Sequence, residues 1–368
     1  MTNRTKIIGG LIIIIAIVLI VYNQFKPASD GKLTIGTIIP LTGNMAFIGE
    51  DFKKGLDLAL DGNSDVQIYY EDNKGSVTDE VSSYQKLQST VKPDVIISAG
   101  IGDLAVIPLA EKDNTPLVLT VSSASGLPAM GENIFRYFTN ADLDAPVMAD
   151  YTINKLGLKK IAILYLQDQF GIDYKDVFSK EIVSKGGQIV GEESFQYSDY
   201  DFKTQISKLK SKDFDSIYLI GLDYQLVTAM KQIRELGISK QILSIGTVAT
   251  RDSIDKAGNA INGAYVTAFC VDGMPKAYVD EFQEKYSTYP GFFSELGYDI
   301  GKMILSASKK EGTEREDIRA GLAKIKNFET NTGLVSADKY GEMVMPVCVK
   351  QITGGKILNT VTGNYSDF

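Results

Sequence analysis

The chain has 368 residues, which is more than one hydrophobic core usually organises, so we expect two globular units. Its formal net charge of −8 argues against nucleic acid as a partner, because phosphate binding needs a basic surface. The absence of histidine excludes Ser-His-Asp and Cys-His nucleophiles and removes the commonest metal ligand.

The N-terminus has the order of an export signal. Arg4 and Lys6 precede the apolar run Ile7–Tyr22, and charge followed by an apolar stretch is typical of such signals. No cysteine follows the run, which excludes lipoprotein processing, and no clear Ala-x-Ala cleavage site follows it. We therefore expect residues 1–22 to remain as a membrane helix, with the rest on the extracytoplasmic face of the cell membrane. The alternative is cleavage near Ala28, which would give a secreted or periplasmic protein.

After a linker of residues 23–32, apolar strand-like runs alternate with amphipathic helix patterns, as in parallel sheets covered on both faces. The first predicted strands are Leu33–Ile39, Val66–Glu71, Val95–Ser98 and Leu117–Thr120, with helices Gly49–Leu60, Val77–Ser89 and Gly102–Lys112. A strand at Ile134–Tyr137 and a helix at Asp142–Leu156 follow. This half predicts one covered sheet.

The alternation then restarts, which indicates a second lobe. Its predicted strands are Lys160–Leu166, Gln188–Glu193, Ser216–Ile220, Ile242–Ile245 and Gly263–Ala268, and its helices are Tyr174–Ser184, Asp201–Leu209 and Gln225–Leu236. Three helices without intervening strands come next, at Pro275–Tyr286, Phe292–Lys309 and Arg315–Ile325, and Met343–Ile352 closes as a strand. Because these helices lack a sheet of their own, we expect them to return to the first lobe.

The predicted fold is therefore α/β, with two doubly wound parallel-sheet lobes and a hinge of three crossovers near residues 140, 270 and 330. Residues 33–140 and 271–330 are assigned to lobe 1, and residues 141–270 and 331–368 to lobe 2. A hinge between two sheets opens and closes on a ligand. In open parallel sheets that ligand lies outside the carboxyl ends of the strands.

The two cysteines, Cys270 and Cys348, lie far apart in segments with strand patterns. Their spacing gives neither a CxxC redox motif nor a zinc cluster. We favour two buried free thiols. A single disulfide in an oxidising compartment is the alternative.

Three loops of the first lobe follow predicted strands. Leu41 and Thr42 follow the first strand, and Gly100, Ile101 and Gly102 follow the third. Hydroxyl and backbone N–H groups at such places suit a small anionic group. Taken alone, the first motif is better explained as a plain turn, and the glycine motif is a weak signal. The fourth strand is followed by the donor-rich residues Ser122, Ser123, Ala124 and Ser125. These fit a carboxylate, and a solvated loop or helix cap is the alternative.

In the second lobe, Phe170 follows the first strand, and Asp223 and Tyr224 follow a later one. Asp223 could accept an ammonium group, and either aromatic ring could supply an apolar wall. The alternative for Asp223, and for Asp168 before Phe170, is that each only caps the next helix.

The ordered motifs resemble the leucine/isoleucine/valine-binding family of ABC-transporter solute receptors over roughly residues 33–355. The matching pieces are Pro40-Leu41-Thr42-Gly43, the Gly-rich third loop, the Ser/Thr run after Pro116-Leu117-Val118, Asn133–Arg136, Lys159–Tyr165 with Phe170-Gly171, Lys231–Gly237 and Tyr298-Asp299. Their specificity lies in the ordered set and not in any one piece.

The resemblance implies a type I periplasmic-binding fold with an amino acid held between the lobes. It implies that the ligand carboxylate meets Gly100–Gly102 and Ser122–Ser125, and that the ammonium meets a Ser/Thr of the first lobe and an acid of the second. That acid would fall at about Gly246 or Thr247, and neither is acidic. Asp223 is the candidate replacement; otherwise the ligand lacks an amine, as carboxylates, amides or aromatic acids do.

We therefore expect an extracytoplasmic solute-binding protein of an ABC importer, clamping a small amino acid or related carboxylate. The partners would be an ABC permease, its ATPase and, through the N-terminal helix, the membrane. We expect a monomer that uses no cofactor or metal and binds no nucleic acid. A membrane-tethered sensor subunit is the alternative. An enzyme such as an amidase is disfavoured, because no catalytic constellation is found.

Overall fold

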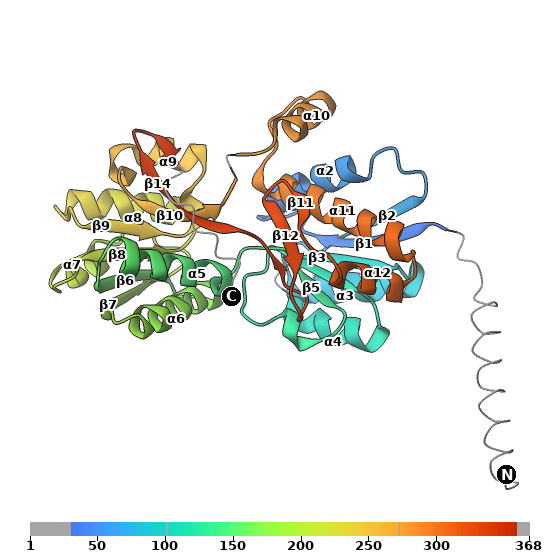
Figure 1. The fold of residues 1–368 in the computed structure, drawn as a ribbon, viewed down its shortest axis with the longest axis horizontal. Coiled ribbons are helices and arrows are strands. Elements are labelled where there is room, and N and C mark those ends of the chain that lie inside the picture. Colours follow the sequence, from blue (N-terminus) through green and yellow to red (C-terminus); the bar gives the residue numbers. More distant parts are fainter. Residues whose placement is uncertain (1–30, 101, 272, 359–368) are drawn as a thin grey trace, which may run out of the picture.

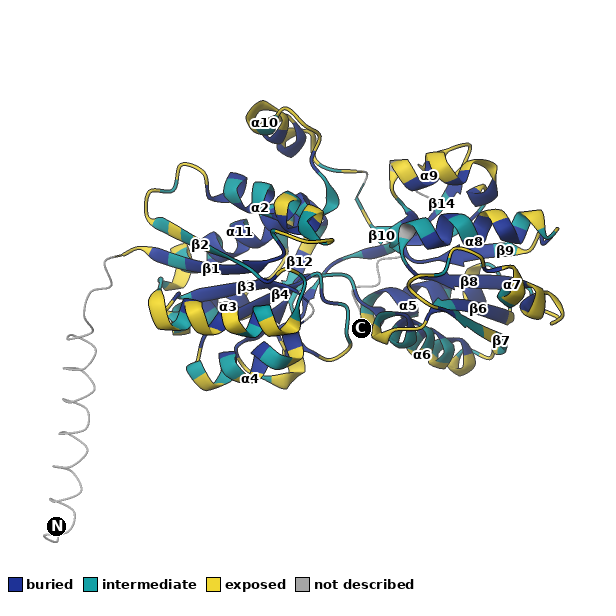
Figure 2. Cartoon of the chain, turned by 180° about the vertical axis from the view of Figure 1, so that it is seen from behind, coloured by how far each residue is buried: buried dark blue, intermediate teal, exposed yellow. Residues whose placement is uncertain are grey.

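The computed structural model describes residues 31–100, 102–271 and 273–358, and these form two lobes that lie side by side (Figure 1). In each lobe, helices cover both faces of a β-sheet, and the chain passes between the lobes near the middle of the molecule. Seen from behind, buried strands lie inside each lobe and the exposed residues lie mainly on the outer helices and loops (Figure 2).

The first lobe has a five-stranded parallel sheet in the order β2-β1-β3-β4-β5. Its strands are β1 (Leu33–Ile39), β2 (Val66–Asp72), β3 (Val95–Ala99), β4 (Leu117–Thr120) and β5 (Ile134–Arg136). Its helices include α2 (Ala46–Leu60), α3 (Val77–Thr90), α4 (Asp103–Asp113), α11 (Phe292–Glu311) and α12 (Arg315–Ala323). Every residue of β3 and β4 is buried, as expected of strands covered on both faces. The predicted alternation is confirmed here.

The late helix α11 returns to the first lobe through close contact with α2. A Cβ atom on Gly55 of α2 would lie 1.8 Å from the backbone oxygen of Ser294, and one on Gly297 would lie 2.3 Å from the backbone oxygen of Phe52. Glycine at these positions is what allows the two helix backbones to approach so closely. Residues of α11 and α12, including Ile300 and Ile318, share a core with β1 and β3, so these two late helices pack on the first lobe as predicted. The third, α10 (Lys276–Tyr286), packs on Leu58 of α2 and not on the sheet.

The second lobe has a seven-stranded sheet in the order β15-β14-β10-β9-β8-β6-β7. Its strands are β6 (Lys160–Leu166), β7 (Gln188–Phe195), β8 (Ser216–Ile220), β9 (Gln241–Ser244), β10 (Tyr265–Phe269), β14 (Val347–Thr353) and β15 (Lys356–Leu358). Its helices include α5 (Ala141–Asp150), α6 (Gln169–Ser184), α7 (Lys203–Lys210), α8 (Asp223–Glu235) and α9 (Arg251–Ala257). The strands from β10 to β7 are parallel, whereas β14 pairs antiparallel with β10. β10 leads out of this lobe and β14 leads back in, so the two run in opposite directions.

The third crossover lies later than expected. Between α12 and β14 the chain forms the short antiparallel strands β11 (Phe328–Thr330), β12 (Gly333–Ala337) and β13 (Met343–Val344). Val335, Met343 and Met345 are buried in the core of the first lobe. The chain therefore leaves that lobe after Met345 and not near residue 330. The predicted strand Met343–Ile352 is divided at Pro346, whose nitrogen cannot donate to a strand ladder.

Cys270 and Cys348 form a disulfide with a Cα–Cα distance of 5.1 Å. The interpretation as two buried free thiols was therefore wrong: Cys270 is exposed, and the β10–β14 register, in which Ala268 faces Cys348, brings the two sulfur atoms together. The bond joins the start of the second crossover, near α10 (Lys276–Tyr286), to the end of the third.

The predicted membrane helix of residues 1–22 lies outside the described residues, as do residues 23–30 of the predicted linker. Among the helices in the described part of the chain, none combines the length and the apolar character needed to cross a bilayer.

Candidate functional site

Loops from the two lobes meet at the ends of strands from both sheets. Ser125, in the loop after β4, donates its backbone N–H to the Oδ2 atom of Asp173 at 3.2 Å. Asp173 lies on α6, which follows β6. Carboxyl-end loops of parallel strands are where α/β sheets hold ligands. The structure thus brings a predicted residue, Ser125, against Asp173, which was not predicted. Helix α6 begins at Gln169 and not at Tyr174 as expected, so Asp173 lies on the helix.

The loop of Ser122–Ser125 is held by a buried arginine at the end of β5. Arg136 is 1% exposed, and its Nη1 atom donates to the backbone oxygens of Ser122, at 3.4 Å, and of Ala124. Along the loop, Ser122 is buried, Ser123 and Ala124 are half-buried and Ser125 is exposed. The exposed end of this loop therefore faces the second lobe, where Ser125 contacts Asp173.

The third loop of the first lobe encloses an internal carboxylate. Glu80 of α3 is completely buried, and its Oε2 atom accepts the backbone N–H of Gly102 at 2.8 Å. Its Oε1 atom accepts the Ser98 hydroxyl at 2.6 Å. A Cβ atom on Gly100 would lie 1.9 Å from Oε2. Gly100 and Gly102, which were predicted to meet a ligand, therefore surround Glu80, and Ile101 lies outside the described residues.

Asp103, at the start of α4, is a second buried acid beside this loop. Its side chain is 4% exposed, and its Oδ1 atom has no hydrogen-bond partner among the described residues. Burial and then the negative charge of Glu80 raise the pKa of Asp103 well above its ordinary value, against the lowering effects of a hydrogen bond with Ser122 and the charge of Arg136. Asp103 therefore holds its proton more readily than an exposed aspartate does.

The first loop is also fastened by a carboxylate. Leu41 donates its backbone N–H to Asp72 Oδ1 at 2.8 Å, and the Thr42 hydroxyl donates to Asp72 Oδ2 at 2.6 Å. Asp72 ends β2, the neighbour of β1. These contacts favour the alternative that the loop is a structured turn.

In the second lobe, the ring of Phe170 packs on Tyr174 with centroids 5.0 Å apart. Asp168 accepts the backbone N–H of Gly171 at 2.8 Å and so caps α6, as its alternative interpretation held. Tyr224 donates to the backbone oxygen of Tyr197 at 3.3 Å. Phe170 and Tyr224 therefore lie at the ends of different strands, β6 and β8.

Asp223 is the first residue of α8, directly before Tyr224. The nearby Thr247 lies in a short 3₁₀ turn after β9, and its hydroxyl donates to the backbone oxygen of Gly221 at 3.0 Å. The loops after β8 and β9 are thereby joined, so Thr247 lies beside the segment that leads into α8.

Phenylalanine side chains that the sequence analysis did not single out cluster at the crossovers. Phe292, at the start of α11, stacks on Phe269 at 6.1 Å and packs on Phe138 at 6.2 Å. Phe293 extends the cluster to Phe47, with distances of 5.3 Å from Phe292 and 6.1 Å to Phe47. Phe138 follows β5 and Phe269 ends β10, so the cluster joins α11 to two crossovers and could supply an apolar wall there.

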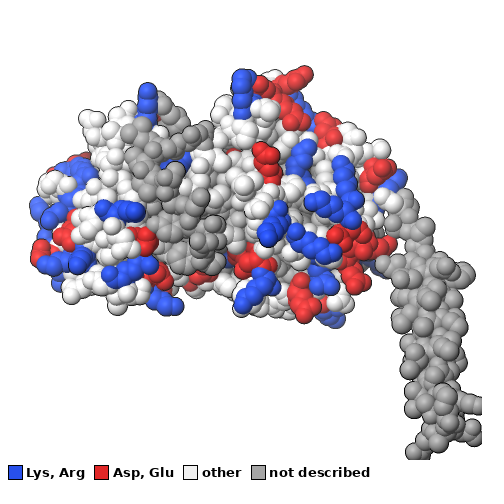
Figure 3. Space-filling view, viewed as in Figure 1, with Lys and Arg blue, Asp and Glu red and all other residues white. Residues whose placement is uncertain are grey.

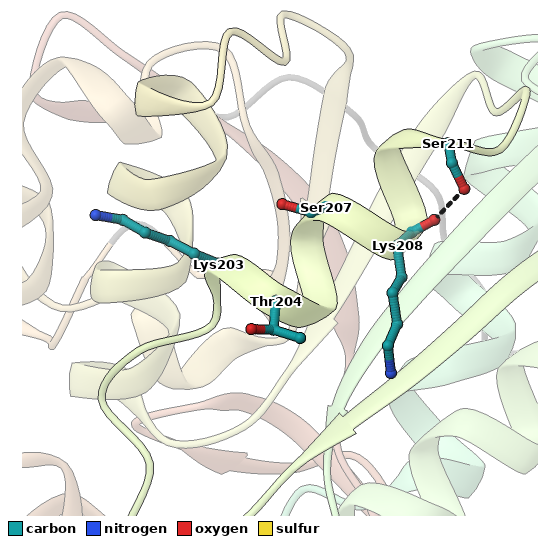
Figure 4. A pocket seen from close by; sticks show the side chains of 5 residues that line it. All are labelled: Lys203, Thr204, Ser207, Lys208 and Ser211. Atoms are coloured by element: carbon teal, nitrogen blue, oxygen red, sulfur yellow. Dashed lines mark hydrogen bonds between the residues drawn. The ribbon is translucent and has the colours of Figure 1, made fainter.

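Neither the charge pattern on one face of the molecule nor the hollow along α7 points to another site among the described residues. On the face in Figure 3, acidic and basic side chains are interspersed, so this face offers no single-signed patch among its described residues. A hollow along α7 lies at the end of the second lobe remote from the first, and its lysines point away from each other (Figures 1 and 4). Lys203 and Lys208 pair with Glu235 at 3.5 Å and Glu193 at 2.9 Å, which leaves this hollow without an uncompensated charge from either lysine.

Comparison with known proteins agrees with this architecture. A family model described as "Periplasmic binding protein" matches residues 32–356. The chain is 27% identical over 340 residues to "Leu/Ile/Val-binding protein homolog 3" of Brucella melitensis, covering 88% of this chain and 91% of the relative. These matches span both lobes.

Solved structures share the fold. The leucine binding protein LivK of Thermotoga maritima has a TM-score of 0.78 and 23% identity, covering 91% of this chain and all (100%) of the other. A solute binding protein of an ABC transporter from Rhodopseudomonas palustris, in complex with 3,4-dihydroxy benzoic acid, has a TM-score of 0.77 and 22% identity, covering 89% and 95%. The predicted two-lobed α/β fold is confirmed by these likenesses.

Proposed function

We propose that this chain, which belongs to the periplasmic binding protein family, is the extracytoplasmic solute-binding protein of an ABC importer. The family is one of solute-binding proteins and not an enzyme class. In the proposed cycle, the two lobes close on a small amino-acid-like or carboxylate ligand, and the closed protein delivers it to a permease with an ATPase.

The meeting of the two lobes at Ser125 and Asp173 carries this proposal. The loops after β4 and β6 approach each other from opposite sheets, at the ends where parallel strands hold ligands. The chain also crosses between the lobes after β5, β10 and β13, and such connecting segments act as a hinge in domain closure. A ligand between these loops would contact both lobes at once.

The ligand contacts are proposed from the residues at these loops. The hydroxyl groups of Ser123 and Ser125 are the candidate donors of the first lobe, and Asp223 at the start of α8 is the candidate acceptor for an ammonium group. The phenylalanine cluster around Phe292 supplies an apolar wall. A relative is named for leucine, isoleucine and valine, and a structural neighbour binds an aromatic acid. These two proteins support a small apolar or aromatic solute as the ligand of this chain.

The location and partners are proposed on the same basis. The disulfide between Cys270 and Cys348 fits an oxidising compartment outside the cytoplasm. The sequence of residues 1–22 is the proposed membrane anchor, which would keep the protein near its permease.

Thermal-shift measurements on the full-length protein with the amino acids and small aromatic acids test the function. A ligand at 100 times its Kd should stabilise the protein by about 2.7 kcal/mol. Ser123→Ala should weaken the binding of that ligand. Ser207→Ala on α7, which is remote from the first lobe, should leave the binding unchanged. A panel in which no compound raises the Tm would overturn the proposal.

A further inference from the structure

Carboxylates of the chain itself already occupy donors at the ends of two first-lobe strands. After β1, Leu41 and Thr42 donate to Asp72 at 2.8 and 2.6 Å. After β3, Gly102 donates its backbone N–H to Glu80 at 2.8 Å. Backbone donors at a strand end or helix start are the general place for a ligand anion. These backbone and hydroxyl donors therefore already bind carboxylates of the protein itself.

The surrounding residues leave room for the Glu80 carboxylate in one position. A Cβ atom on Gly100 would lie 1.9 Å from Glu80 Oε2 and 2.8 Å from Asn73 Nδ2, and one on Gly102 would lie 2.9 Å from Oε2. A larger residue at position 100 would displace the carboxylate. The Ser98 hydroxyl, at 2.6 Å from Oε1, fixes its other oxygen. The two glycines of this loop thus accommodate Glu80.

A second acid is buried in this region. Asp103 is buried beside Glu80, and its Oδ1 atom lacks a hydrogen-bond donor within the described part of the chain. The buried Arg136 already forms two hydrogen bonds to Glu342 through Nε and a third through Nη2, at 2.6–3.1 Å. A ligand carboxylate brought here would meet the negative charge of Glu80 in a desolvated place, which is unfavourable.

We propose that Glu80 sets the ligand specificity of the first lobe. The solute would present a carboxamide, which can donate a hydrogen bond, and not a free carboxylate to the loops after β3 and β4. Glu80 is a positioning residue, since it acts through Gly102 and Ser98 without touching the solute. The inference rests on the proposed function and narrows its ligand to the neutral amide relatives of amino acids and aromatic acids. The Ser122–Ser125 loop, which carries both hydroxyl donors and carbonyl acceptors, suits an amide.

Calorimetric titration of the full-length protein with matched pairs tests this inference. The probes are leucine against leucinamide and benzoate against benzamide. In at least one pair the amide should bind at least tenfold more tightly than the acid. Glu80→Ala frees the N–H of Gly102 and should reduce that ratio at least tenfold. Asp144→Asn, which alters a buried acid with an unpartnered oxygen in the second lobe, is the matched control and should leave the ratio unchanged.

The outcomes separate the inference from the proposed function. If, in every pair that binds the wild-type protein, the acid binds as tightly as its amide, the inference is overturned and the function stands. Equal changes of the ratio in Glu80→Ala and Asp144→Asn also overturn it, because they indicate a general structural effect. Absence of binding by both members of every pair, and by the wider panel, overturns the function and the inference together. If Glu80→Ala does not fold, Glu80→Gln removes the charge at nearly constant shape, and an unchanged ratio there counts against the inference.

Discussion

Arg136 and Glu342 form a buried ion pair between residues 206 positions apart in the chain, with a shortest N–O distance of 2.6 Å. Arg136 also holds the Ser122–Ala124 backbone, and Glu342 accepts the side-chain amide of Asn140 at 3.3 Å. Asn140 caps α5 directly after the first crossover. One ion pair therefore links the candidate ligand loop to two segments of the hinge.

Glu342→Gln should lower the free energy of unfolding by about 3 kcal/mol, because it leaves the arginine charge buried without its partner. Urea denaturation would measure the loss, and 0.5 M salt should change the wild-type value little, since buried pairs are poorly screened. Asp252→Asn breaks the exposed pair of Asp252 with Lys256 on α9 and should have no measurable effect. Equal losses in the two variants would show that burial does not matter to the pair.

Asp144 should make the protein less stable as the pH rises from 4 to 7. It is buried in the second lobe, where Tyr174 donates to its Oδ2 atom at 2.9 Å, and burial raises its pKa from 3.8 to about 7. A raised pKa means that the folded state holds the proton more tightly than the unfolded state. Its stabilising effect is therefore complete below pH 3.8 and is lost as the pH rises through 7.

Asp144→Asn should remove this dependence, on the order of a few kcal/mol across the range. The variant should gain stability relative to the wild-type protein at pH 8 compared with pH 5, as measured by urea denaturation at both values. Burial also raises the pKa values of Asp299 and Glu295, to about 7 and about 8. The variant should therefore still lose some stability as the pH rises. If the difference in unfolding free energy between the variant and the wild-type protein is the same at both pH values, Asp144 is not the source of the pH dependence.

The long, fully buried elements were predictable from the sequence because their patterns are set locally. The run at Val95–Ala99 is buried at every position, and its short length and β-branched residues identify a covered strand without reference to the rest of the fold. The short strands β11 and β12 were not predicted, since they are brief and partly exposed. β13 was predicted only as the start of a longer strand. Their arrangement also needs Gly333 at a φ of +120°, which is a tertiary constraint that the local pattern does not reveal.

The candidate site was predictable only as a set of loops. The positions of Ser122–Ser125 follow from where β4 ends, but their attachment to Arg136 depends on the return of a distant segment. Glu80 could have been found, because it shares a helix face with Tyr84 and Leu87, which are also buried. An acid on that apolar face signals a buried partner, and its donors become visible only in the folded structure.

Gly55→Ala should destabilise the first lobe by about 1–3 kcal/mol, the usual cost of overpacking a core. The new Cβ atom would lie 1.8 Å from the backbone oxygen of Ser294, so α2 and α11 would have to separate. Thermal denaturation would measure the change. Gln85→Ala, on an exposed position of α3, is the matched helix control and should be near neutral. Equal melting temperatures for the two variants would show that the contact between α2 and α11 accommodates a methyl group without loss of stability.

Removal of the disulfide should weaken the connection between the second and third crossovers. Cys270 and Cys348 are separated by 78 positions, and a closed loop of that size restricts the unfolded chain enough to contribute about 2–4 kcal/mol. The double variant C270S/C348S should lose this amount in urea denaturation. A thiol reductant should destabilise the wild-type protein to the same extent and leave the double variant unchanged. A reductant effect on the double variant would show that the reagent acts elsewhere, whereas equal stability of all forms would mean that the β10–β14 pairing alone holds these segments together.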